Sequence, residues 1–173
     1  MFIFSTQNRR RINVWAGIFN RQIIGPFFYE QNLNHQFYCT LLQNDIISAI
    51  NNIAAEEEFL PWFQQDGCPA HNTGDIRAVL AMRFGDRVIG NDYPTHWPAR
   101  SPDLAPCDYF LWGYLHDQLY DGIAFENIEA LENEIRRILV NIPQQLLINT
   151  TNDFYERLGF CAAANGGLFE HLF

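Results

Sequence analysis

Hydrophobic and polar residues alternate near the start of the chain. Residues 12–19 place Ile, Val, Ala and Ile at every second position, and a second apolar run covers residues 23–29. The polar break Asn20-Arg21-Gln22 separates the two runs. This pattern predicts a β-hairpin.

Helical spacing dominates the rest of the chain. Apolar residues recur at intervals of three and four in the stretches 34–54, 72–84, 128–139 and 146–164. Asn34 is a plausible N-cap for the first of these. Short strands are expected before Asp66 and at Arg87–Gly90, with an ordered loop at 91–106. The order of elements predicts a single α/β domain with a mixed sheet flanked by helices.

Asp66 follows the short apolar run that extends from Phe59 to Phe63 and precedes Gly67. We interpret this run as a buried strand that ends in Asp66. Asp108 comes two residues after Pro106, which favours the first turn of a helix. Spacings of three and four residues place Asp108 on the same stripe as three leucines: Leu111, Leu115 and Leu119.

Carboxylates at the end of a strand and in the first turn of a helix are oxygen ligands that Mg²⁺ accepts. A simpler interpretation is favoured by how common such residues are in turns and at helix starts. Asp66 is also suited to open an Asp-Gly turn, and Asp108 is also suited to complement the helix dipole. Spacing alone does not separate the two interpretations.

The composition narrows the class of protein. The 173 residues are 48% hydrophobic and carry a formal net charge of −9, which is unlike a free-standing DNA-binding module. A small basic cluster, Arg9 to Arg11, is interpreted as a solvated strand edge. We identify no signal peptide and no apolar run long enough to span a membrane, so an intracellular protein is expected.

The four cysteines, Cys39, Cys68, Cys107 and Cys161, are widely spaced and are expected to be reduced thiols. A structural zinc site is an alternative use for two of them. Cys68 and His71 have an acceptable ligand spacing, and Cys107 with His96 would complete the set.

Three motifs carry a family resemblance: F-Q-Q-D-G-C-P-A-H-N, W-P-A-R-S-P-D-L-A-P-C-D-Y-F-L-W-G and N-G-G-L-F-E-H-L-F. Together with N-R-R-R-I-N-V-W-A-G near the start, they resemble the transposases of the mariner superfamily, especially those of insect genomes. The resemblance covers roughly residues 8–173.

The resemblance implies a ribonuclease H-like catalytic domain in which three acids hold two divalent metals, Mg²⁺ or Mn²⁺. Such a domain cleaves transposon DNA and transfers its strands in the nucleus. By position, Asp66 matches the second acid and Asp108 the third, so both are expected to be metal ligands and catalytic residues. Asp103 is the rival for the third acid, but we assign it a loop-capping role. His71 matches a family position near the second acid, where it orients a ligand or is a turn histidine.

The chain departs from the family pattern at its start. The family's first acid lies on the strand before the hairpin, whereas the first acidic residue here is Glu30. We therefore expect a truncated catalytic domain that lacks the first strand, the first catalytic acid and the N-terminal DNA-binding region. Such a fragment is expected to be inactive alone. The alternative is a non-enzymatic remnant that acts as an interaction module, as a homodimer or with intact transposase.

Overall fold

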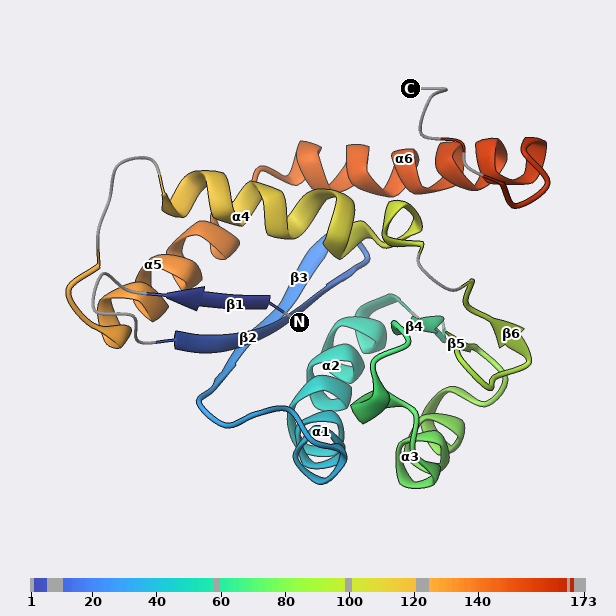
Figure 1. Ribbon diagram of the computed structural model, residues 1–173, viewed down its shortest axis with the longest axis horizontal. Coiled ribbons are helices and arrows are strands. Elements are labelled where there is room, and N and C mark those ends of the chain that lie inside the picture. Colours follow the sequence, from blue (N-terminus) through green and yellow to red (C-terminus); the bar gives the residue numbers. More distant parts are fainter. Residues whose placement is uncertain are drawn as a thin grey trace. The chain divides into compact units, whose positions relative to one another are not determined.

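The structure is a computed structural model that describes residues 2–5, 11–57, 60–98, 101–120, 125–167 and 169. The chain divides into two compact units. The first comprises Met1–Glu30 with Ser101–Phe173, and the second comprises Gln31–Arg100 (Figure 1). Of the basic cluster, Arg9 and Arg10 lie outside the described residues.

The first unit is built on a three-stranded antiparallel sheet in the order β1-β2-β3. Its strands are β1 (Phe2–Ser5), β2 (Arg11–Phe19) and β3 (Gln22–Tyr29). The predicted hairpin is confirmed: Phe19 pairs with Gln22 across a two-residue turn. Asn20 and Arg21 have φ angles of 46° and 64°, the left-handed geometry that matches the twist of a hairpin.

Two details of the predicted sheet are corrected. A short strand, β1, does precede the hairpin, because the apolar Phe4 buries its ring in the core at 2% exposure. The single mixed sheet is resolved into an antiparallel sheet in the first unit and a separate parallel sheet in the second.

The helical segments of the first unit come from the second half of the chain. They are the 3₁₀ turn η3 (Pro102–Leu104), the π-helical turn η4 (Cys107–Leu111), α4 (Trp112–Leu119), α5 (Ile128–Val140) and α6 (Gln144–Ala163). The side chain of Asn127 caps α5 by accepting from the Ala130 N–H at 2.8 Å. The C-terminal turn of α6 is closed by the Gly166 N–H, which bonds to the Cys161 carbonyl at 2.9 Å.

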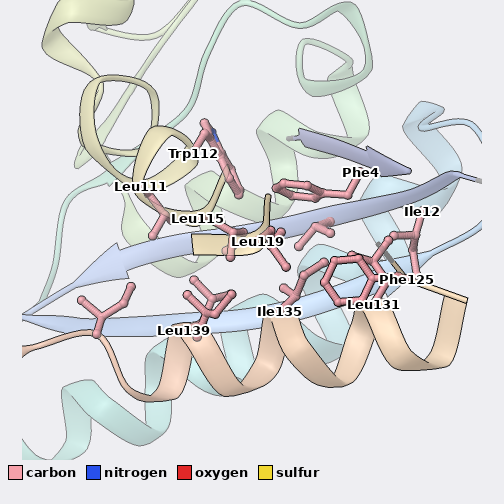
Figure 2. Packing of buried hydrophobic residues seen from close by; sticks show 14 of the residues in the cluster. Phe4, Ile12, Leu111, Trp112, Leu115, Leu119, Phe125, Leu131, Ile135 and Leu139 are labelled. Carbon is pink, nitrogen blue, oxygen red and sulfur yellow. The ribbon is translucent and has the colours of Figure 1, made fainter. Parts of the chain in front are cut away.

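The core of the first unit forms where α4 and α5 pack against the strands (Figure 2). One apolar stripe comes from each helix, as the spacing predicted. Eight of the buried residues are Phe4, Ile12, Leu111, Leu115, Leu119, Leu131, Ile135 and Leu139. This core holds the turn that carries Asp108.

The second unit begins with a long helical stretch: α1 (His35–Leu41), the π-helical turn η1 (Leu42–Ile46) and α2 (Ile47–Glu57). The predicted cap is confirmed, because the Asn34 side chain accepts from the Phe37 N–H at 2.9 Å. There follow β4 (Phe63–Gln64), the 3₁₀ turn η2 (Pro69–His71), α3 (Gly74–Phe84), β5 (Val88–Gly90) and β6 (Thr95–His96).

The strand before Asp66 is shorter than predicted. Only Phe63 and Gln64 pair with β5, while Leu60 and Trp62 are each 55% exposed. Phe63 is buried, and its ring centroid lies 5.1 Å from that of Phe84. The strands β4, β5 and β6 run parallel in that order. Among the described residues, no helix is long and apolar enough to cross a membrane.

Candidate functional site

Asp66 is held just beyond the end of β4 by its neighbour Gln65. The Gln65 N–H bonds to the Ile89 carbonyl at 3.0 Å and extends the strand pairing by one residue. The Gln65 side chain is buried, accepts from the Tyr38 hydroxyl and donates to the His71 carbonyl, both at 3.2 Å. A buried amide with both ends satisfied fixes the backbone on which the carboxylate sits.

The Asp66 carboxylate receives two hydrogen bonds on one oxygen. Its Oδ1 accepts from the Cys68 backbone N–H at 3.1 Å and lies 2.6 Å from Nδ1 of His71. An ionised carboxylate can only accept, so Nδ1 carries the proton and donates. The His71 hydrogen bond lowers the pKa of Asp66 from 3.8 to about 2, with the Cys68 N–H adding to the effect and partial burial opposing it.

This arrangement leaves the other carboxylate oxygen open. The Asp66 side chain is 55% exposed, and no hydrogen bond from the described residues reaches Oδ2. His71 is almost fully buried and its ring lies 4.2 Å, centroid to centroid, from that of Tyr38. The result is an ionised carboxylate with one oxygen anchored and one available to a cation.

Asp108 lies in the first unit, in the π-helical turn η4 that follows Pro106. Its N–H bonds to the Ala105 carbonyl at 2.8 Å. The prediction that it shares the apolar stripe with the leucines is wrong, because Asp108 is exposed whereas Leu111 is fully buried. A π-helical turn holds more residues than the 3.6 of an α-helix, so the predicted phase fails across this turn.

The residue after Asp108 anchors the π-helical turn to α6. The Tyr109 hydroxyl donates to the Thr150 carbonyl at 2.8 Å, and the Arg157 guanidinium lies over the Tyr109 ring at 4.2 Å. Burial raises the pKa of Tyr109 to about 12, although the nearby Arg157 opposes this. Arg157 also donates to the Asp103 carbonyl at 3.2 Å. Asp103 therefore contributes its main chain to this support, and its predicted side-chain capping role stays a prediction.

The four zinc ligands proposed from the sequence differ in their burial and in their neighbours. The Cys107 thiol contacts the Ala16 carbonyl at 3.9 Å, and burial raises the pKa of this thiol to about 12, which disfavours a metal-binding thiolate. His96 is exposed on β6. Cys68 and His71 do come together, but with Asp66: their ligand atoms all lie within 4.8 Å of one another. We did not group Asp66 with them from the sequence, although the D-x-C-x-x-H spacing carried the signal.

Known proteins with a similar sequence or structure identify the fold. No family model matches the chain. The Transposable element Tc3 transposase of Caenorhabditis elegans is 23% identical over 159 residues, which cover 90% of this chain and 45% of that protein. A structure of the Mos1 transposase catalytic domain with raltegravir and Mg matches 98% of this chain and 82% of its own, with a TM-score of 0.84 at 20% identity. The chain has the fold of a mariner transposase catalytic domain.

The mariner catalytic fold confirms the resemblance inferred from the motifs, together with the predicted ribonuclease H-like class. A Mos1 transposase paired-end complex with left transposon end also matches, over 96% of this chain and 47% of its own, with a TM-score of 0.76 at 22% identity. The chain thus spans less than half the length of the curated relative it matches.

Proposed function

We propose that this chain is the catalytic part of a transposase that cleaves and joins the ends of transposon DNA in the nucleus. Asp66 and Asp108 supply two of the carboxylates that bind divalent metal in this activity. The fold similarity to the Mos1 catalytic domain supports the proposal. The observation that carries it is the state of Asp66, which is ionised, anchored on Oδ1 and open on Oδ2.

The donor chemistry fits a hard cation. Mg²⁺ and Mn²⁺ accept carboxylate oxygens, and a carboxyl group with a pKa of about 2 is ionised at neutral pH without competition from protons. When bound in a two-metal site, such ions activate the attacking oxygen and stabilise the leaving oxygen of the phosphodiester. Asp66 is the residue of the second unit that we assign to this role.

The chain's own residues contribute orientation. His71 holds the Asp66 carboxylate in one rotamer, so less conformational freedom is lost when a ligand binds Oδ2. Tyr109 and Arg157 hold the first turn of the segment that carries Asp108. Both carboxylates are exposed, as residues that receive a charged substrate must be.

Mn²⁺ binding tests the assignment without requiring DNA cleavage. Titration of the chain with Mn²⁺, followed by the electron paramagnetic resonance signal of the free ion, is expected to show binding that Asp66→Asn and Asp108→Asn each weaken at least about tenfold, or about 1.4 kcal/mol. Asp103→Asn is the matched control, because it removes an acid from the same segment. Equal binding by wild type and both variants would overturn the assignment, and selective loss with Asp103→Asn would transfer the role from Asp108 to Asp103.

A further inference from the structure

We propose that Asp66, Cys68 and His71 form a binding site for a thiophilic divalent cation of the Zn²⁺ class. The three residues offer a carboxylate oxygen, a thiol sulfur and an imidazole nitrogen, and these atoms lie within 4.8 Å of one another. A mixed sulfur, nitrogen and oxygen set is typical of zinc, whereas Mg²⁺ takes oxygen ligands. The donor set therefore distinguishes this site from one for the hard cation discussed above.

The local backbone brings the three donors together. Pro69 opens the 3₁₀ turn η2, and Cys68 is the capping residue just before it. The His71 N–H bonds back to the Cys68 carbonyl at 2.9 Å, which keeps the two residues together. The Cys68 N–H bonds back to Asp66 Oδ1 and folds the carboxylate over this turn. The buried Gln65 side chain holds the His71 carbonyl from beneath. The ligands are thus positioned before any ion arrives.

The spacing and the charge of the set suit a tetrahedral ion. Zinc bonds of about 2.0–2.3 Å place neighbouring ligand atoms about 3.3–3.8 Å apart. Side-chain rotations that move the ligand atoms by about 1 Å therefore complete a tetrahedral geometry. The Asp66 carboxylate, a Cys68 thiolate and a neutral His71 together balance a charge of +2. Binding releases the thiol proton of Cys68 to solvent, and the fourth position is left for water.

The two ring nitrogens of His71 allow it to change from a hydrogen-bond donor to a metal ligand. In the metal-free protein Nδ1 donates to Asp66, and the buried Nε2 has no hydrogen-bond partner among the described residues. When Nδ1 binds the ion, the ring proton moves to Nε2. One buried nitrogen is unpaired in each state, so ligation adds no unsatisfied group.

Cys68 gives the site its selectivity. A thiolate adds affinity for Zn²⁺ but little for Mg²⁺. If Asp66 serves the catalytic cation as proposed, then Zn²⁺ at this site competes for the same carboxylate and inhibits the transposase. Binding of Zn²⁺ itself does not depend on that function.

Co²⁺ is the spectroscopic probe for the site. The reduced 173-residue chain is titrated with Co²⁺ in excess Mg²⁺. We expect a thiolate-to-cobalt charge-transfer absorption that saturates at one ion per chain and disappears on addition of Zn²⁺. Cys68→Ser should abolish the absorption and His71→Gln should weaken Co²⁺ binding at least about tenfold, or about 1.4 kcal/mol. Cys39→Ser, which changes another free cysteine of the same unit, should leave the absorption intact.

Two results would overturn the proposal: no charge-transfer absorption in the wild-type chain, or an absorption that persists in Cys68→Ser. Zinc X-ray absorption of the wild-type chain gives a measurement that does not rely on variants, and a ligand shell without sulfur would contradict the site. Mn²⁺ binding by Cys68→Ser is expected to match the wild type. Failure of the Co²⁺ experiment therefore leaves the carboxylate assignment to be judged by its own titration.

Discussion

The Nδ1 atom of His71 lies 2.6 Å from Oδ1 of Asp66, and this hydrogen bond fixes both the ionisation and the orientation of the carboxylate. His71→Phe keeps a ring against Tyr38 and removes the donor. We expect the pKa of Asp66 to rise from about 2 towards 3.8 in this variant. Carboxyl-carbon NMR titration measures the change. His96→Phe, at an exposed histidine of the same unit, is the control. An unchanged pKa of Asp66 in His71→Phe would refute the assignment.

The same pair predicts an acid-dependent stability. The folded-state pKa of Asp66 is lower than the value of 3.8 expected for the unfolded chain, so the pairing stabilises the fold above that pH. The contribution is lost as the pH falls from 3.8 to about 2. The difference in unfolding free energy between wild type and His71→Phe should shrink over this range. It is expected to be modest, because the Asp66 side chain is 55% exposed.

Tyr109 is expected to stabilise the first unit through its hydroxyl. Tyr109→Phe removes the hydrogen bond to the Thr150 carbonyl but leaves the ring under Arg157. We expect the free energy of unfolding to fall by about 1 kcal/mol, as measured by urea denaturation. Tyr155→Phe is the matched control, because that side chain is 67% exposed, and its effect should be close to zero. Similar losses in the two variants would show that the Thr150 contact contributes nothing specific.

Leu115 is expected to be a principal residue of the core in the first unit. It lies on α4 and is fully buried in the hydrophobic core, so Leu115→Ala should lower the free energy of unfolding by about 2–5 kcal/mol. Leu158→Ala on α6, where the side chain is 40% exposed, should change it by less than about 0.5 kcal/mol. Thermal or chemical denaturation of the two variants distinguishes them. A free energy of unfolding that Leu115→Ala leaves nearly unchanged would contradict the packing described for this unit.

Most of the fold could be predicted from residues whose local chemistry agrees with their tertiary setting. Alternation predicted the hairpin, and a side-chain acceptor at Asn34 predicted the start of α1. The strand before Asp66 was overestimated, because an apolar run does not reveal that Leu60 and Trp62 point to solvent. The exposure of Leu60 and Trp62 depends on which residues pair with β5. That pairing is not a local property of the sequence.

The role of Asp66 and Asp108 as metal ligands stays a prediction of the motifs. Helical periodicity wrongly placed Asp108 on the buried stripe, because it assumed a uniform pitch through η4. The grouping of Asp66 with Cys68 and His71 depends on a 3₁₀ turn and a backbone hydrogen bond to the Asp66 carboxylate. Neither feature has a hydrophobic pattern that could reveal it.

The 173-residue chain tested alone is expected to show no DNA strand cleavage. Two carboxylates, Asp66 and Asp108, match the family motif, and two ligands hold a pair of ions less firmly than three. The test is nicking of plasmid DNA that carries transposon ends, with Mg²⁺ or Mn²⁺. Robust cleavage that Asp108→Ala abolishes would contradict the expectation, and Asp103→Ala serves as the control for a change in the same segment.

The central claim is that Asp66 and Asp108 bind divalent metal. The most direct measurement is a crystal structure of the chain grown with Mn²⁺, in which anomalous scattering locates the ion. We expect anomalous density at the open Oδ2 of Asp66 and anomalous density at the carboxylate of Asp108. Well-ordered carboxylates at both positions, with Mn²⁺ absent from them or bound only elsewhere on the chain, would contradict it.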